Sequence, residues 1–214
     1  MNLYEQHRPT DLQGIVGQDK AVKTLSRLAS KGLGGKALWL SGASGTGKTT
    51  LARIIAKMVS DDFSITEYDS ADELTAQELR DIDSTQGQYG LGAKSGRAYI
   101  VNESHGLSGI AVRRLLGILE RIPSHVVWIF TTTKEGECKL FDGQIDASPL
   151  LSRCLEIRLT NQGLNKAFAS HCQTIARTEG LDGKPIAAYE ALARKCHNNC
   201  RMMLQQIEAG IMMD

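Results

Sequence analysis

Residues Leu38 to Val59, LWLSGASGTGKTTLARIIAKMV, decide how the rest of the chain is interpreted. Within this stretch, the segment from Gly42 to Thr49 matches the pattern G-x-x-x-x-G-K-[ST] at every fixed position. An apolar run, Lys36 to Ser41, precedes the match, and apolar residues at helical spacing follow it. A strand, a glycine-rich loop and a helix in this order predict a phosphate-binding loop, or P-loop.

The residue types of this loop suit phosphate. Glycines leave the backbone N–H groups accessible and can adopt positive φ angles. Lys48 would supply a positive charge to the β- and γ-phosphates, and Thr49 a hydroxyl to Mg²⁺. The helix that follows directs its N-terminal N–H groups at the anion. The predicted nucleotide-contacting residues of the loop are Gly42, Ala43, Ser44, Gly45, Thr46, Gly47, Lys48, Thr49 and Thr50.

Length and composition limit the classes of protein to which the chain can belong. With 214 residues, 42% of them apolar, it can form one large domain or a medium domain plus a small one. The net charge of +1 gives no global field for nucleic acid, so contact with DNA requires a local patch. No segment reaches the roughly 18 consecutive apolar residues of a membrane span, and the N-terminus lacks the apolar core of a signal peptide. We therefore expect a cytoplasmic protein with no membrane partner, whose five cysteines are reduced thiols.

Strands and helices alternate between residues 19 and 159. Besides the segment before the P-loop, four segments have strand character and are separated by helical patterns: 63–68, 97–102, 125–130 and 154–159. Strands that are apolar on both sides predict a parallel sheet covered by helices on both faces. Beyond Gly163 the pattern is helical only. We therefore predict an α/β nucleotide-binding domain over residues 1–161, with a parallel five-stranded sheet between helices, and a small all-helical lid domain over residues 162–214.

Polar residues follow the strands behind the P-loop. The strand at 97–102 leads into Asn102 and Glu103, where a nucleotide hydrolase needs a metal-binding group and a carboxylate that orients the attacking water. Threonines 131–133 end the next strand, where a hydroxyl can hold the γ-phosphate or the water, and Arg153 precedes the last strand. Each feature also has an ordinary interpretation, as a solvated acid, a strand terminus or a surface charge. Their order behind a P-loop favours a joint catalytic role.

In these motifs the chain resembles AAA+ ATPases of the clamp-loader group, which includes replication factor C small subunits and the bacterial DNA polymerase III tau/gamma subunit. The matching motifs are Tyr4-x-x-x-Arg8-Pro9, Ile15-Val16-Gly17-Gln18, the P-loop, Glu103-x-His105-x-Leu107-Ser108 and Ser152-Arg153-Cys154. They extend over essentially the whole chain, and the Ser-Arg-Cys triplet is the most discriminating. The resemblance implies a P-loop AAA+ fold with ATP and Mg²⁺ as cofactors.

The resemblance also implies roles for residues outside the P-loop. The adenine and ribose pocket would be lined by Tyr4, Arg8, Pro9, Val16 and Gly17. Thr132 or Thr133 would be the sensor 1 residue, and Arg201 the sensor 2 residue on the lid. Arg153 would act in trans, as a finger that reaches the ATP of a neighbouring subunit. With Glu103, these are the catalytic residues that the resemblance predicts.

The chain departs from the family pattern in three places. Asn102 stands where the family has the Walker B aspartate, so beside Thr49 it would hold Mg²⁺ through a water molecule but add no charge. If the charge at the metal is limiting, Asn102→Asp is expected to strengthen the metal site. The cysteine-rich zinc module after the P-loop helix is missing. The sequence stops after the lid, before the family's helical collar, and we therefore expect the 214-residue chain alone to be monomeric.

The resulting prediction is an ATP-hydrolysing clamp-loader subunit that acts in a ring with other subunits. It would place a sliding clamp on primer-template DNA in the cytoplasm, at the nucleoid or at a viral replication site. Two alternatives remain open: a nucleotide-binding but hydrolysis-deficient clamp-loader subunit, motivated by Asn102, and another AAA+ DNA remodeller such as a branch-migration motor. Candidates for DNA contact are Arg80, Arg113 and Arg114, because helices of this part face the inner channel of the ring in the family.

Overall fold

The computed structural model of this chain describes residues 2–133, 146 and 148–213. Within these residues, five strands form one sheet in the order β2-β3-β4-β1-β5, and every adjacent pair is parallel. The strands are β1 (Lys36–Ser41), β2 (Ile65–Tyr68), β3 (Arg97–Val101), β4 (Val126–Thr132) and β5 (Leu155–Arg158). The predicted parallel five-stranded sheet is confirmed. The predicted bounds of β2 to β5 differ from the observed ones by one or two residues at their ends; at β2, Asp62–Ser64 form a 3₁₀ turn ahead of the strand.

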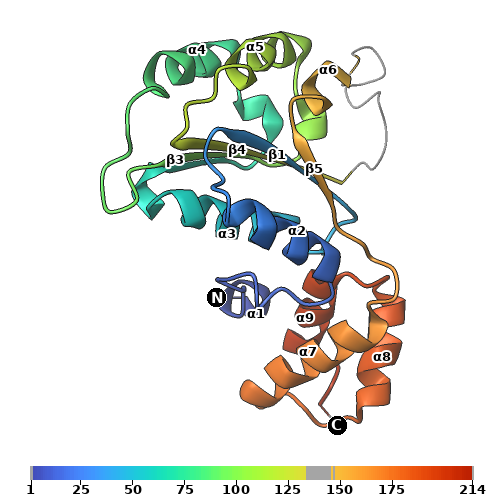
Figure 1. Ribbon diagram of the computed structural model, residues 1–214. Coiled ribbons are helices and arrows are strands. Elements are labelled where there is room, and N and C mark those ends of the chain that lie inside the picture. Colours follow the sequence, from blue (N-terminus) through green and yellow to red (C-terminus); the bar gives the residue numbers. More distant parts are fainter. Residues whose placement is uncertain (1, 134–145, 147, 214) are drawn as a thin grey trace.

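Helices cover both faces of this sheet (Figure 1). One face carries α2 (Asp19–Ala29) and α3 (Lys48–Val59), and the other carries α4 (Ala76–Thr85), α5 (Gly109–Leu119) and the short α6 (Ser148–Leu151). Strand β1 shows why the sequence folds in this way. Leu38 and Leu40 belong to the core under α2 and α3, whereas Ala37 and Trp39 belong to the core under α4 and α5. Successive side chains of a strand point to opposite faces, so a strand buried on both sides is apolar throughout.

Three further helices follow β5 and pack on one another: α7 (Asn165–Thr178), α8 (Ile186–Lys195) and α9 (Cys200–Glu208). They surround a core of their own, which includes Phe168, Tyr189 and Met203. The N-terminal arm is ordered and contains a short helix, α1 (Leu3–Gln6), whose Leu3 enters this same core. The arm therefore packs on α9, and it lies between the three helices and the α2–α3 side of the sheet (Figure 1).

Among the described residues, no helix combines the length and apolar character that crossing a bilayer requires.

The four cysteines in the described part of the chain are free thiols, as predicted, and Cys138 lies outside that part. Burial raises the pKa of Cys154, next to the predicted finger arginine, to about 12, so this thiol stays protonated at neutral pH. The Sγ atoms of Cys172 and Cys200 lie 3.9 Å apart, and their hydrogen bond together with burial raises the pKa of Cys172.

Candidate nucleotide-binding site

The P-loop connects the C-terminal end of β1 to the start of α3. Its turns depend on Gly45 and Gly47, whose φ angles of +76° and +98° lie in the region that favours glycine. The Nζ atom of Lys48 donates to the carbonyl oxygens of Gly42, at 2.7 Å, and Ala43, at 2.9 Å. The lysine is therefore folded across the loop, and its charge lies beside the N-terminus of α3.

A polar pocket lies at this helix N-terminus. Its lining combines the P-loop, the ends of β3 and β4, the arm and the lid: Arg8, Ser44, Gly45, Gly47, Lys48, Thr49, Thr50, Glu103, Thr133 and Arg201. Three cationic side chains in this lining, together with the N–H groups of the helix N-terminus, suit phosphate oxygens. The residues that are present therefore fit the phosphates of a nucleotide.

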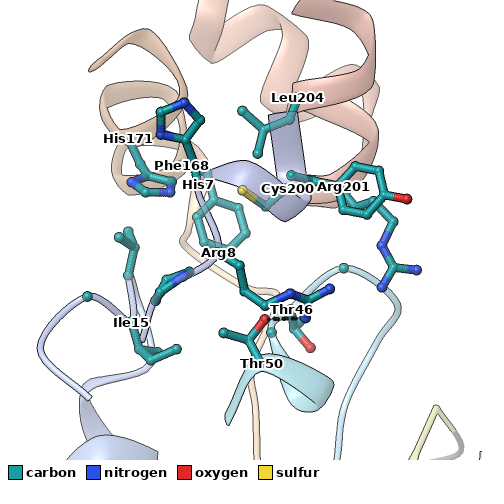
Figure 2. A pocket seen from close by; sticks show the side chains of 16 residues that line it. His7, Arg8, Ile15, Thr46, Thr50, Phe168, His171, Cys200, Arg201 and Leu204 are labelled. Carbon is teal, nitrogen blue, oxygen red and sulfur yellow. Dashed lines mark hydrogen bonds between the residues drawn. The ribbon is translucent and has the colours of Figure 1, made fainter. Parts of the chain in front are cut away.

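A larger and more apolar pocket lies next to it, between the arm, the P-loop and the lid (Figure 2). It encloses about 670 Å³ when the space open to solvent is counted. Its lining consists of Tyr4, His7, Arg8, Pro9, Gly14, Ile15, Val16, Gly45, Thr46, Gly47, Thr50, Phe168, His171, Cys200, Arg201 and Leu204. Four of the five residues predicted for an adenine pocket are in this lining, and Gly17 is not.

Gly17 lies behind the pocket, where the arm meets the start of the lid. Its φ angle is +74°, and a Cβ atom built there would approach Cδ2 of Leu164 to 2.6 Å. The adjacent Gln18 holds the same junction: its Oε1 accepts from the Thr160 N–H at 3.0 Å and its Nε2 donates to the Thr160 carbonyl at 2.8 Å. The structure thus corrects the expected place of Gly17, which allows a close backbone approach instead of lining the pocket.

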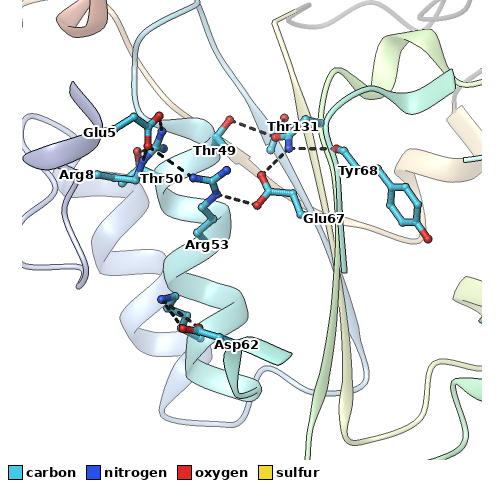
Figure 3. Close-up of polar contacts among 11 residues, drawn as sticks. Glu5, Arg8, Thr49, Thr50, Arg53, Asp62, Glu67, Tyr68 and Thr131 are labelled. Atoms are coloured by element: carbon cyan, nitrogen blue, oxygen red, sulfur yellow. Dashed lines mark hydrogen bonds and ion pairs between the residues drawn. The ribbon is translucent and has the colours of Figure 1, made fainter. Parts of the chain in front are cut away.

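Asn102 is the centre of a hydrogen-bond network at the end of β3, and Figure 3 labels its partners Thr49, Glu67, Tyr68 and Thr131. Its buried Oδ1 accepts from the hydroxyls of Thr49, at 3.2 Å, and Thr131, at 3.0 Å. Its Nδ2 donates to Oε1 of Glu67 at 2.9 Å and to the carbonyl oxygen of Tyr68 at 3.2 Å. Oxygen atoms are the ligands that Mg²⁺ requires, so the Thr49 hydroxyl and the Asn102 amide oxygen fit the ion and would hold it.

Glu103 follows in a left-handed conformation, with φ 47° and ψ 45°, which is strained for a residue other than glycine. Its Oε2 lies 3.4 Å from Oγ1 of Thr133 and 3.4 Å from Nδ1 of His105. The Thr132 hydroxyl lies 3.4 Å from the same His105 nitrogen and is outside the lining of both pockets. Of the two sensor 1 candidates, Thr133 is therefore at the pocket, beside Glu103, and Thr132 is behind it.

The two predicted arginines occupy different places. Arg201, in the first turn of α9, lines both pockets, and its guanidinium carbon lies 5.5 Å from the centre of the Tyr4 ring. Arg153 lines neither pocket. Its Nε donates to Glu120 at 3.2 Å and its Nη1 to the carbonyl oxygen of Pro149 at 2.7 Å. Arg201 thus belongs to the pocket of its own chain, and Arg153 does not.

Sequence reasoning missed the residues that close the apolar pocket from the arm and the lid, chiefly His7, Ile15, Phe168, His171 and Leu204. Burial, together with the nearby His7, lowers the pKa of His171, so this imidazole is neutral at pH 7. The apolar members of the set carry a helical periodicity signal, but that signal does not distinguish a side chain in a core from one in a pocket wall.

The arrangement of the described residues matches solved structures. The RuvB Holliday junction branch migration motor of Thermotoga maritima has a TM-score of 0.72 to this chain, with 22% identity, over 94% of this chain and 64% of that one. The family model of the TIP49 P-loop domain matches residues 2–85. The chain has the P-loop AAA+ fold. Proteins with this AAA+ fold bind nucleotides, generally with Mg²⁺, and are generally ATPases.

The sequence relatives of this AAA+ chain are subunits of a DNA polymerase. The DNA polymerase III subunit gamma of Buchnera aphidicola subsp. Schizaphis graminum is 31% identical over 180 residues, which are 73% of this chain and 47% of that subunit. The DNA polymerase III subunit tau of Escherichia coli is 27% identical over 231 residues, which are 98% of this chain and 34% of that subunit. The chain thus spans about half or less of the length of these curated relatives. The resemblance predicted from the motifs is confirmed.

Proposed function

We propose that this chain binds ATP with Mg²⁺ between the P-loop and the lid, and that it hydrolyses ATP as a subunit of a DNA clamp loader. One observation carries the proposal: a phosphate-binding lysine, a metal-binding hydroxyl, a strand-end acid and a lid arginine converge on one polar pocket. These residues are Lys48, Thr49, Glu103 and Arg201. The similarity to gamma and tau subunits supports the clamp-loader role.

Each side chain would have a distinct task. Lys48 and Arg201 would neutralise the β- and γ-phosphates, and Glu103 would orient the attacking water, with Thr133 holding the carboxylate as sensor 1. Mg²⁺, when bound, would neutralise charge on the transferred phosphoryl group. Arg153 of a neighbouring subunit would complete the site in trans, because an arginine finger typically contributes about 10³ to 10⁵ in rate.

A nucleotide-binding subunit with little hydrolysis is the second candidate. Asn102 favours it, since its amide offers an oxygen to the ion beside Thr49 but no negative charge. Turnover of the assembled ring with clamp and primed DNA separates the two candidates: a rate near that of the isolated chain would favour the silent subunit. A branch-migration motor gains no comparable support, because a likeness at 22% identity to RuvB reports the fold alone.

The proposed partners are other clamp-loader subunits in a ring, a sliding clamp and primer-template DNA, in the cytoplasm, with this chain alone monomeric. Arg80, Arg113 and Arg114 are exposed on α4 and α5, which cover the sheet face away from the lid (Figure 1), and we propose them as DNA contacts.

We also propose a nucleotide-binding domain over residues 1–161 and a lid domain over residues 162–214, because α7–α9 have their own core. Residues 134–145 of the first domain lie outside the described part of the chain.

Calorimetric titration of the chain with ATP and Mg²⁺ tests the binding site. Lys48→Ala is expected to abolish binding, because the phosphates lose their main cation. Lys57→Ala is the matched control, since Lys57 lies on the same helix but contacts Asp62, away from both pockets. Equal affinities in the Lys48→Ala and Lys57→Ala chains would refute the assignment of the site.

A further inference from the structure

The groups around Asn102 determine which way its amide points. On one side lie two acceptors, the Glu67 carboxylate and the Tyr68 carbonyl oxygen, 2.9 and 3.2 Å from Nδ2. On the other side lie the hydroxyls of Thr49 and Thr131, which donate to Oδ1 at 3.2 and 3.0 Å. An amide has one donor end and one acceptor end. Only the observed orientation therefore satisfies all four contacts.

Glu67 stands on β2, behind Asn102, and lines neither pocket. Its Oε2 accepts from Nε of Arg53, on α3, at 2.7 Å, while its Oε1 accepts from Asn102. The hydrogen bond to Glu67 raises the pKa of Arg53. Nη1 of Arg53 also lies 4.0 Å from Oε2 of Glu5. Glu5 in turn forms an ion pair with Arg8, which lines both pockets. The carboxylate of Glu67 is thus held from one side and directs Asn102 from the other.

We propose that Glu67 is a positioning residue that keeps the amide oxygen of Asn102 toward Thr49, and that it places on β2 the negative charge that Asn102 lacks on β3. This inference rests on the proposed function, because it concerns how this chain would hold Mg²⁺. Partners behind a metal ligand commonly fix the ligand's orientation. Without Glu67, the Tyr68 carbonyl oxygen at 3.2 Å is the one of these two acceptors that remains. The NH₂ end of the amide can then turn toward Thr49 more readily, and that end repels a cation.

The same geometry reverses the expectation for Asn102→Asp. A carboxylate at position 102 has no donor end, so one oxygen would replace Nδ2 at 2.9 Å from Oε1 of Glu67. Two carboxylates at this distance repel each other. The sequence-based expectation that this single change strengthens the metal site therefore fails to account for Glu67.

The compensating change is Glu67→Gln. The new amide can donate to a carboxylate at position 102 and can still accept from Arg53 through its oxygen. The Tyr68 carbonyl loses the side-chain donor but keeps the backbone N–H of residue 102, which lies at 3.0 Å. The exchange of acid and amide between the two strands preserves the net charge and most of the hydrogen bonds.

A double-mutant cycle on the nucleotide-free chain tests this coupling. Urea unfolding is expected to show a lower midpoint for Asn102→Asp and for Glu67→Gln, and recovery of most of the loss when the two are combined. Glu156→Gln is the matched control, because Glu156 is also a strand glutamate paired with an arginine, Arg158. Combined with Asn102→Asp, it should recover nothing. If the stability losses of the two single variants simply add in the Glu67→Gln, Asn102→Asp chain, the proposal is overturned.

The role toward the metal needs a readout that a purely structural residue would not change. Calorimetry with ADP, in Mg²⁺ and in EDTA, gives the factor by which Mg²⁺ tightens binding. Glu67→Ala is expected to reduce this factor about tenfold, with the affinity in EDTA unchanged. If circular dichroism shows that Glu67→Ala is unfolded, Glu67→Gln takes its place. Equal losses with and without Mg²⁺ would overturn the positioning role. A wild-type chain that binds no ADP would instead refute the proposed function.

Discussion

Gly45→Ala probes the contact between the P-loop and the lid. A Cβ atom built on Gly45 would lie 1.9 Å from Oδ1 of Asn199, the residue that precedes α9. That oxygen caps α9 by accepting from the Met202 N–H at 3.1 Å. An ordinary contact begins near 3.4 Å, so Asn199 would have to withdraw by about 1.5 Å. Such a shift breaks the cap.

The expected loss of stability has two parts. Gly45 has a φ angle of +76°, and alanine in the left-handed region costs about 1–2 kcal/mol, partly offset by a stiffer unfolded chain. Loss of an N-cap costs about 1 kcal/mol more. We therefore expect Gly45→Ala to lower the free energy of unfolding by about 2 kcal/mol. Gly163→Ala is the matched control: its φ is +71°, nothing lies within 4 Å of its Cβ, and only the first part applies.

Urea unfolding of the nucleotide-free chain measures both losses. Asn199→Ala removes the cap and the clash together, so in combination with Gly45→Ala the loss should be about 1 kcal/mol smaller than the sum of the two. Gly45→Ala should also weaken ADP binding, because a displaced Asn199 would move the start of α9, where Arg201 lines the pocket, whereas Gly163→Ala should not. Equal losses for Gly45→Ala and Gly163→Ala would show that the lid does not rest on the P-loop in this way.

Three further predictions concern the reaction and its pH dependence. Glu103→Gln should retain ATP binding in calorimetry and lose ring-stimulated turnover; a normal rate would remove Glu103 from the mechanism. Arg153→Ala should leave the ATP affinity of the isolated chain unchanged and abolish turnover of the ring, and weaker binding by the monomer would mean that this arginine acts in cis. The folded chain holds the pKa of His171 below its usual 6.5, so the unfolded chain takes up the proton first. Stability should therefore fall as pH drops below about 6.5, and urea unfolding of His171→Gln should show a smaller fall.

The P-loop and the sheet were predictable because their signals are local or periodic. β1 begins and ends at the predicted residues, Lys36 and Ser41, because the positions after Lys36 are buried and the apolar ones alternate between the two cores. The glycines and Lys48 act through the backbone of their own loop, so their spacing alone identifies the phosphate site. A prediction of this kind needs no knowledge of where distant segments lie.

The sequence by itself therefore determined the P-loop, the parallel sheet and the change to helices after Gly163. Only the tertiary structure decided which threonine stands at the pocket, that Gly17 stands behind it, and that Glu67 meets Asn102 across two strands. The physical reason is that hydrophobic periodicity reports whether a side chain is buried, not which group buries it. Hydrogen-bond partners that are 35 residues apart come together only when β2 and β3 pair and bring their C-terminal ends side by side.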